Sequence, residues 1–208
     1  MNEAMKKERP ILFSAPMVRA LLAGTKTQTR RIVKQRKDRQ LGCYLAPCEL
    51  AGEVNAGKFD NCPYGHPGDR LWVRESFQPL LADGVEYADS NWETGAGYQI
   101  NYPASGGAVE YIDMDDNIKS GSKPSIHMPR WACRILLEIV SVRIEKLQTT
   151  SEADAEAEGV DFLRHVPDAD ETLTAAQLYA CLWDSINGDG SWDTNPWVWV
   201  VEFKRIES

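Results

Sequence analysis

The chain has 208 residues, 43% of them hydrophobic, and carries a formal net charge of −8 at pH 7. This size is typical of one domain with a single core, and the acidic balance argues against a protein wrapped in nucleic acid. No apolar run approaches the ~18–20 residues that span a bilayer, and the charged N-terminal segment does not resemble a signal peptide. We therefore expect a cytoplasmic protein that does not enter membranes. The five cysteines, an odd number, do not suggest a disulfide scaffold.

Positive charge is concentrated in residues 26–39, where seven cations and one anion give +6 and leave −14 for the rest of the chain. The seven cations are Lys26, Arg30, Arg31, Lys34, Arg36, Lys37 and Arg39. A basic patch on an acidic body favours a compact anionic or electron-rich ligand over a long polyanion.

The N-terminal part is predicted to contain a strand at residues 11–13 and a short amphipathic helix at residues 17–23. Pro16 suits the first helical position, and Gly24 suits the residue just past the helix end, where a positive φ is often needed. Directly afterwards, residues 25–31 present only polar and charged side chains. Such a segment is either a solvated loop or the lining of a pocket.

Two long stretches, residues 40–69 and 82–123, lack a sustained hydrophobic period and are predicted to be loops or insertions. The best strand within the second stretch is residues 109–112. The first stretch holds four residues that could in principle bind zinc: Cys43, Cys48, Cys62 and His66. Structural zinc sites usually pair ligands about two to four residues apart, and this spacing is a poor match. A loop with free thiols is therefore favoured over a metal site.

A strand is predicted at residues 70–77, where apolar and larger or charged side chains alternate. Trp72 is expected to be part of the core. Arg74 and Glu75 are typical of a surface ion pair, but their position near the end of the strand also makes them candidates for a site.

A helix is predicted to begin at Ser151, which has Asp154 three residues on in a capping-box pattern, and to end at Gly159. Glu158 lies in its last turn, where the helix dipole disfavours a negative charge by roughly 0.3–1 kcal/mol. It also stands four residues from another carboxylate. A cationic partner from elsewhere is therefore expected for Glu158, and the alternative is a solvated acidic helix.

The remaining predicted elements are a strand at residues 134–147, an amphipathic helix at residues 174–186 and a strand at residues 197–206. One face of the last strand is predicted to be core: Trp197, Trp199, Val201 and Phe203. Short strands and helices separated by long loops indicate an α+β protein. We expect a small mixed β-barrel with short helices packed at its ends.

Lys26 and Thr29 are spaced to face the same way in a helical or tight-turn backbone and opposite ways in a strand. If paired, they would form a hydroxyl nucleophile with an amine base. A lysine can act as this base only if its pKa falls from about 10.4 toward neutrality, through burial or neighbouring cations. Arg30 and Arg31 supply such cations, and Glu158 would hold the lysine or a proton-bearing group of the substrate.

The segment Gly24-x-Lys26-Thr27-x-Thr29-x-Arg31 resembles the opening motif of the ASCH domain family, which has a PUA-like β-barrel fold. Further stretches resemble a longer, phage- and prophage-associated branch of the family: residues 9–13, 67–75, 125–130 and 195–200. The resemblance implies a single domain over residues 1–208, with insertions near 36–66 and 80–123. These insertions are a departure from the small members of the family.

Some small bacterial ASCH proteins are amidohydrolases that remove the acyl group from N4-acetylcytidine and related N4-acylated cytosines. Carried over by motif, their catalytic residues correspond to Lys26, Thr29 and Glu158, the last through the similarity of residues 151–158 to a family segment. The resemblance implies a nucleoside or base as substrate, with no cofactor or metal. Arg31 or a backbone N–H would stabilise the oxyanion. The candidate substrate-binding residues are Arg31, Trp72, Arg74 and Glu75.

A second hypothesis is an RNA-binding PUA-like protein without catalysis, because other members of this fold bind RNA. The basic window and the aromatic residues favour it through phosphate contacts and base stacking, and the net charge counts against it. A third is an accessory protein that acts through partners and has lost its site.

Overall fold

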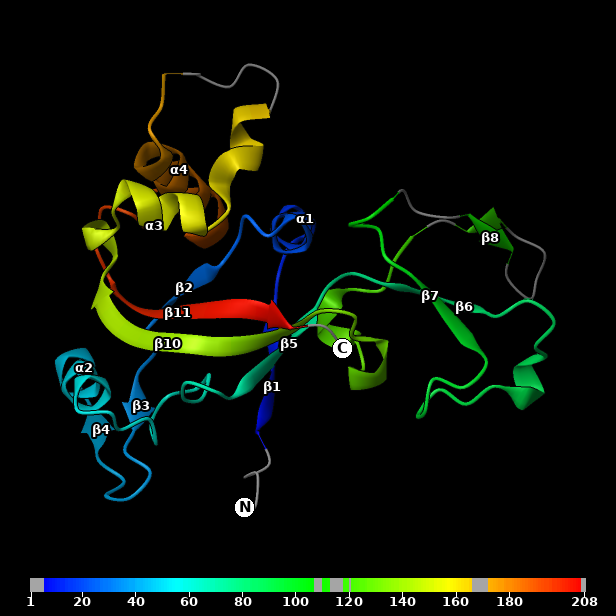
Figure 1. The fold of residues 1–208 in the computed structure, drawn as a ribbon, viewed down its shortest axis with the longest axis horizontal. Coiled ribbons are helices and arrows are strands. Elements are labelled where there is room, and N and C mark those ends of the chain that lie inside the picture. Colours follow the sequence, from blue (N-terminus) through cyan, green and yellow to red (C-terminus); the bar gives the residue numbers. More distant parts are fainter. Residues whose placement is uncertain (1–5, 107–109, 113–117, 120, 166–171, 207–208) are drawn as a thin grey trace. The chain divides into compact units, whose positions relative to one another are not determined.

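The computed structural model of the chain describes residues 6–106, 110–112, 118–119, 121–165 and 172–206 (Figure 1). Its α-helices are α1 (Ala15–Ala23), α2 (Pro47–Asn55), α3 (Glu152–Ala157) and α4 (Ala175–Asn187). Its longer strands are β1 (Glu8–Leu12), β2 (Gln28–Ile32), β5 (Arg70–Arg74), β6 (Gln78–Leu81), β7 (Tyr98–Asn101), β10 (Leu136–Lys146) and β11 (Trp197–Ile206). Two-residue strands are β3 (Arg36–Lys37), β4 (Tyr44–Leu45), β8 (Tyr111–Ile112) and β9 (Ile118–Lys119). Helices and strands together make the protein α+β, as predicted.

Five strands form the main sheet in the order β1-β5-β10-β11-β2. β1 and β2 are its outer strands, so among the described residues the sheet is open and not closed into the expected barrel. The chain leading into β2 contacts both a helix and a strand: the Thr27 N–H donates to the carbonyl of Ala157 at the end of α3, and the Thr27 carbonyl accepts from the N–H of Phe203 in β11, each at 2.8 Å. The other sheets have two strands each, β3-β4, β6-β7 and β8-β9.

β11 is buried on both faces, whereas the sequence predicted one core face. Trp199 and Val201 are buried as expected, and Val198 and Val200 on the opposite face are each 0% exposed. The second face is covered because it packs into a cluster with side chains of α3 and α4, the helices drawn beside β11 in Figure 1. A strand between two packed layers loses the alternation of buried and exposed positions.

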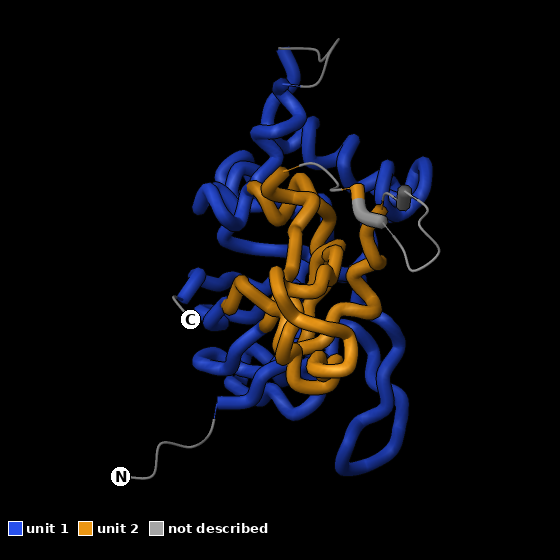
Figure 2. The backbone as a smooth tube through the Cα atoms, turned by 90° about the vertical axis from the view of Figure 1, so that its right-hand side faces the viewer, with its two compact units in different colours: residues 1–9, 20–71, 137–206 blue, residues 10–19, 72–136, 207–208 orange. Residues whose placement is uncertain are grey.

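The chain divides into two compact units, shown in blue and orange in Figure 2. Unit 1 consists of residues 1–9, 20–71 and 137–206, and unit 2 of residues 10–19, 72–136 and 207–208. In unit 1 the helical side of the core gathers around Tyr179 and Trp183 of α4. In unit 2 a smaller cluster forms around Phe77 and Met128.

The first stretch predicted to be loop contains α2, which the sequence analysis missed. Pro47 occupies the start of the helix, Glu49 accepts a hydrogen bond from the N–H of Ala46, and Leu50 and Val54 are its buried residues. That pattern is the expected signature of a short helix with one apolar stripe. In the second stretch, Tyr111 and Ile112 form β8, while Val109 lies outside the described residues.

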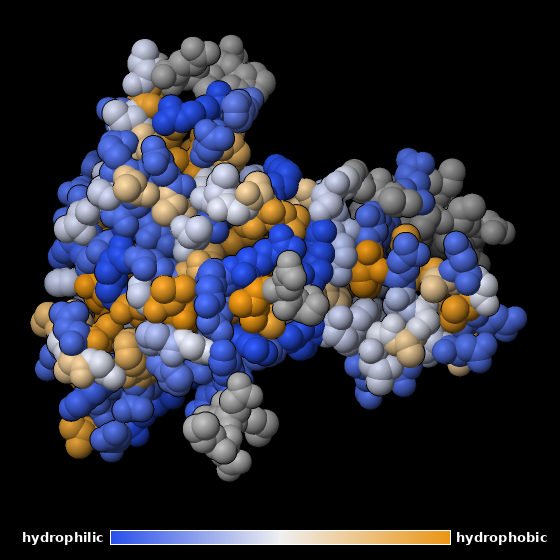
Figure 3. Space-filling model, in the orientation of Figure 1, coloured by the Kyte–Doolittle hydropathy of each residue, from blue (hydrophilic) through white to orange (hydrophobic). Residues whose placement is uncertain are grey.

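The face drawn in Figure 3 is mostly hydrophilic, with hydrophobic side chains in separate patches. Scattered exposed apolar residues of this kind are normal for a globular surface. Across the described part of the chain, no helix combines the length and apolar character needed to cross a membrane.

Candidate functional site

Lys26 lies in the short connection between α1 and β2. Gly24, at φ +78°, ends the helix, and the N–H groups of Thr25 and Lys26 both donate to the carbonyl of Ala20, at 3.0 and 3.2 Å. This tight turn directs the lysine inward, where it is only 3% exposed. The predicted helix end at Gly24 is confirmed, and the polar stretch that follows is not a solvated loop at Lys26.

Glu158 caps the C-terminal end of α3, and Ser151 caps the other end in the predicted capping box. The Lys26 ammonium donates to the Glu158 carboxylate, with 2.9 Å from Nζ to Oε2, and to the Glu158 carbonyl oxygen at 2.8 Å. The expected cationic partner of Glu158 is thus Lys26. The lysine meets both the side chain and the free carbonyl of the helix end, where a positive charge is favoured.

Gly159 permits this contact. Its φ of +76° is a left-handed conformation that suits glycine after a helix. A Cβ atom at this position would lie 2.9 Å from the Cβ atoms of both Ala20 and Lys26, closer than side-chain atoms pack. The absence of a side chain therefore lets the end of α3 rest directly on the turn that carries Lys26.

Arg30 extends the pair into a buried network. Its guanidinium is 0% exposed and contacts three carboxylates: Glu158 through Nη1 at 3.3 Å, Glu145 through Nη2 at 2.8 Å and Asp154 through Nη2 at 3.3 Å. Gln28, on the same face of β2, donates to the Asp154 carbonyl at 2.6 Å. The start of the basic window is therefore built into the protein rather than offered to solvent.

Burial and neighbouring charges act on the pKa of Lys26 in opposite directions. Complete burial lowers the pKa of Lys26 because a charged ammonium is poorly solvated there. The Glu158 carboxylate opposes this effect, while the positive charges of Arg31 and Arg30 add to it, and the net pKa is below the ordinary value. A buried amine with a lowered pKa can exist in its neutral form, which is the form that accepts a proton.

Tyr179 of α4 is a member of this network that the sequence analysis missed. Its hydroxyl donates to Glu158, and burial raises its pKa well above the ordinary value of 10.0. The Cζ atom of Arg30 lies 5.9 Å from the centre of its ring. In the sequence this tyrosine was one position of an amphipathic helix, and the partner 21 residues before it gave no local signal.

Thr29 is buried in β2, opposite Val201 of β11. Strand alternation places Thr29 and Arg31 on the face opposite to Gln28 and Arg30, which reach α3. Lys26 precedes the strand, and its Nζ contacts Glu158 on the side that Arg30 also reaches. The structure therefore brings Lys26 and Glu158 together and places Thr29 on the opposite face of β2. Arg31, half-buried on the Thr29 face, lies close enough for its charge to lower the Lys26 pKa.

The other predicted binding residues, Trp72, Arg74 and Glu75, belong to unit 2. The Arg74 guanidinium lies over the Trp72 ring, 5.4 Å from its centre, and donates to the carbonyl of Ile126. Glu75 is 1% exposed and receives two hydrogen bonds from Arg134, at 2.9 and 2.8 Å. We interpret this Glu75 pair as structural, because both carboxylate oxygens already have donors.

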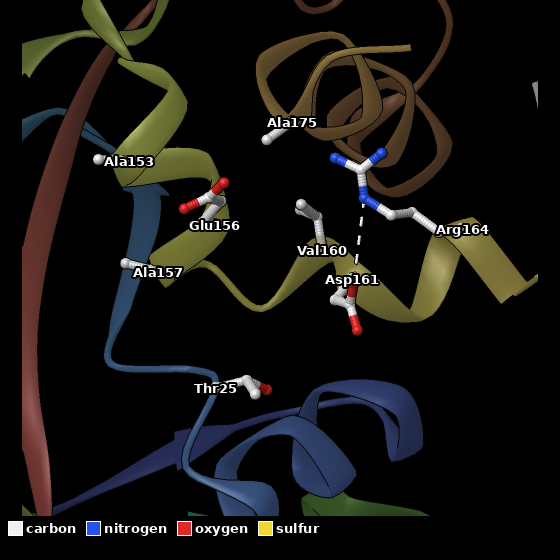
Figure 4. Close-up of a pocket in the computed structure, with 8 residues that line it drawn as sticks. All are labelled: Thr25, Ala153, Glu156, Ala157, Val160, Asp161, Arg164 and Ala175. Atoms are coloured by element: carbon white, nitrogen blue, oxygen red, sulfur yellow. Dashed lines mark ion pairs between the residues drawn. The ribbon is translucent and has the colours of Figure 1, made fainter. Parts of the chain in front are cut away.

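A pocket of about 450 Å³ opens between α3, the 3-10 segment η5 (Val160–His165) and the start of α4 (Figure 4). Small and apolar side chains, including Ala157 and Val160, form part of its wall, and the ion pair between Arg164 and Asp161 lies on one side. Thr25, which lines it, immediately precedes Lys26 in the chain. Lys26 and Glu158 are not among the eight lining residues of this pocket.

The four possible zinc ligands are not gathered. Cys43 and Cys48 are exposed and Cys62 is buried, all as free thiols. Within the described ranges, no three His, Cys, Asp or Glu side chains lie together in a group that could hold a metal ion.

Comparison of the chain with protein-family models, curated proteins and solved structures gives no match.

Proposed function

We propose that this protein is an amidohydrolase that removes the acyl group from an N4-acylated cytosine nucleoside or base. The observation that carries the proposal is the buried contact between Lys26 and Glu158, in which the pKa of the lysine is lowered. The resemblance of the opening segment and of residues 151–158 to ASCH amidohydrolases supplies the substrate class. On this proposal the open five-stranded sheet is a variant of the PUA-like plan.

The proposed reaction requires Lys26 Nζ to reach the Thr29 hydroxyl on the other face of β2. The neutral amine then accepts the proton of that hydroxyl as its oxygen attacks the acyl carbonyl carbon. The carbon–nitrogen bond then breaks, and Lys26 returns the proton to the leaving exocyclic nitrogen of cytosine. This leaves the acyl group as an ester on Thr29. Water, deprotonated by Lys26, hydrolyses the ester and releases the carboxylic acid, which restores the free hydroxyl.

Glu158 acts in this scheme by placing Lys26, because its two oxygens already accept from Lys26 and Arg30. Arg31 is proposed to stabilise the oxyanion. It shares a face of β2 with Thr29, and its guanidinium offers several N–H donors to an oxyanion.

The test is the release of cytidine from N4-acetylcytidine, measured by chromatography for the wild type and single variants. Lys26→Met and Thr29→Ala are expected to reduce kcat/KM by about 10²–10⁴-fold, the usual contribution of a positioned base or its nucleophile. The matched controls are Thr27→Ala, an exposed neighbour in the same motif, and Glu156→Gln, an exposed carboxylate on α3. Activity retained in Lys26→Met or Thr29→Ala, or lost in the controls, would reject the proposed roles.

A second candidate function, binding of single-stranded RNA, is favoured by the β3–β4 hairpin. There Lys37 lies over the exposed ring of Tyr44, 5.2 Å from its centre, in the part of the basic window that remains accessible. A salt titration of binding to a short RNA tests it, because phosphate contacts release counterions and weaken as salt rises. Affinity that does not change with salt, or with Lys37→Ala, removes this candidate.

A further inference from the structure

Tyr179 occupies a fixed place on α4. The helix begins after Thr174, whose side chain accepts a hydrogen bond from the N–H of Gln177. The Tyr179 ring is 4% exposed and packs against Trp183 and Trp192, with ring centres 6.2 and 6.1 Å apart. Its hydroxyl therefore points into the protein from a side chain held by packing on two sides.

The Glu158 carboxylate receives donors from three different elements. Lys26 of the turn before β2 donates to Oε2 at 2.9 Å, Arg30 of β2 donates to Oε1 at 3.3 Å, and Tyr179 of α4 adds its hydroxyl. A carboxylate offers about four lone-pair positions, so three donors can share it without competition. The orientation of the carboxylate is thereby defined from three directions.

We propose that Tyr179 is a positioning residue of the Lys26–Glu158 site: together with Arg30 it fixes the Glu158 carboxylate and takes up part of its negative charge, which keeps Lys26 available as a base. The inference deepens the proposed amidohydrolase function and rests on it for the substrate. The contacts among Lys26, Arg30, Glu158 and Tyr179 do not themselves depend on which substrate is bound. Nothing in the ASCH resemblance or the motif spacing assigns this role, since Tyr179 lies outside the matching segments.

The charge balance around Lys26 gives the sign of the effect. The charged and titratable groups of the network are Lys26, Arg30, Arg31, Glu145, Asp154, Glu158 and Tyr179. A hydrogen bond to a carboxylate stabilises its charge and weakens the attraction that it exerts on another partner. Without the Tyr179 hydroxyl, Glu158 holds the protonated Lys26 more firmly, and a smaller fraction of the lysine is neutral at a given pH.

The experiment compares wild type with Tyr179→Phe, which removes only the hydroxyl and keeps the ring against Trp183 and Trp192. The side-chain resonances of Lys26 are titrated by NMR and assigned by their loss in Lys26→Arg. We expect the pKa of Lys26 to rise by about 0.5–1 in Tyr179→Phe, the value of one hydrogen bond to a charged network. Leu178→Val, a buried change in the same cluster, controls for loss of packing and should leave that pKa unchanged.

The pH dependence of kcat/KM for N4-acetylcytidine gives the second readout. Its rising limb should move to higher pH in Tyr179→Phe, and not in Leu178→Val. A Lys26 pKa that is equal in wild type and Tyr179→Phe overturns the positioning role. A shift of that pKa in a protein that does not hydrolyse N4-acetylcytidine supports the positioning role and rejects the proposed function, so the two can fail separately.

Discussion

Each of the two units buries a glutamate, but the two carboxylates have different partners. In unit 2, Glu75 is held by Arg134 through two hydrogen bonds. In unit 1, Glu158 is shared between Lys26, Arg30 and a tyrosine hydroxyl. The Glu75 carboxylate is bound at both oxygens by one guanidinium. The Glu158 carboxylate is bound by side chains from three different elements.

The difference between these sites is whether a group can change its charge. The Arg134 guanidinium stacks on Tyr102, 4.0 Å from the ring centre, and also donates to Ser105. These contacts fix Arg134 on several sides, which supports a structural interpretation of the Glu75 pair. Lys26 can lose its proton, and burial pushes it in that direction. Of the two buried glutamates, Glu158 is therefore the better candidate for a reactive site.

The largest expected effect on stability follows from removing the shared carboxylate. Glu158→Ala leaves Lys26 and Arg30 as buried cations that have lost a partner, which should lower the free energy of unfolding by about 3–5 kcal/mol. Glu156→Ala, two residues earlier and exposed, should change it by no more than about 0.5 kcal/mol. Urea denaturation measures both, and equal losses in the two variants would show that the network does not stabilise unit 1.

A smaller loss is expected in unit 2. Arg134→Met leaves Glu75 buried without its partner, but the Arg134 side chain is 25% exposed and water can reach the gap. We expect about 2–3 kcal/mol, below the range for a fully buried pair. Hydrolysis of N4-acetylcytidine should be unaffected once the variant is folded. A loss of activity at unchanged stability would return Glu75 to the list of substrate-binding residues.

The two sites should also respond differently to pH. Between the lowered pKa of Lys26 and its ordinary value of 10.5, the folded protein binds fewer protons than the unfolded chain. The contribution of Lys26 to the free energy of unfolding therefore rises with pH between these two pKa values and is constant above 10.5. The difference in unfolding free energy between wild type and Lys26→Met should increase as pH rises toward 10.5, whereas that for Arg134→Met should stay flat from about pH 6 to about pH 9. Parallel curves would contradict a lowered Lys26 pKa.

The smallest effect is expected at a half-buried carboxylate whose two lysine partners are exposed. Glu138 lies between Lys6 and Lys204, at 2.7 and 2.8 Å, and these hydrogen bonds lower its pKa from 4.5 to about 2. Its contribution is present above pH 4.5 and is lost as pH falls through 2, and solvent screening keeps it small. Glu138→Gln should change stability slightly near neutral pH and less in high salt. A loss as large as that of Glu158→Ala would remove the contrast between buried and exposed pairs.

Local signals in the sequence were sufficient for much of unit 1. The helix caps at Ser151 and Gly24 predicted where one helix begins and another ends, because these residues satisfy end groups within a few positions. The misplaced charge of Glu158 also predicted a cationic partner, since a helix end disfavours a carboxylate on its own. The structure confirms that partner as Lys26.

The rest of the site depends on contacts far apart in the chain. In the sequence, Arg30 is one of the seven cations of residues 26–39. In the structure it is fully buried and bonds to carboxylates more than 100 residues later in the chain. Tyr179 reads as an ordinary core residue of α4. The second core face of β11 was missed because Val198 and Val200 share it with Glu202 and Lys204, which indicated a side turned to solvent.

The central claim is that neutral Lys26 is the base, and one comparison of two pKa values tests it most directly. The pKa of Lys26 is measured by NMR in the free protein, and the rising limb of kcat/KM against pH is measured with N4-acetylcytidine, which reports the free enzyme. We predict that the two midpoints coincide below the ordinary lysine value and that Lys26→Arg has no such limb. A Lys26 that titrates at its ordinary pKa, or a rate that does not follow its titration, would contradict the account.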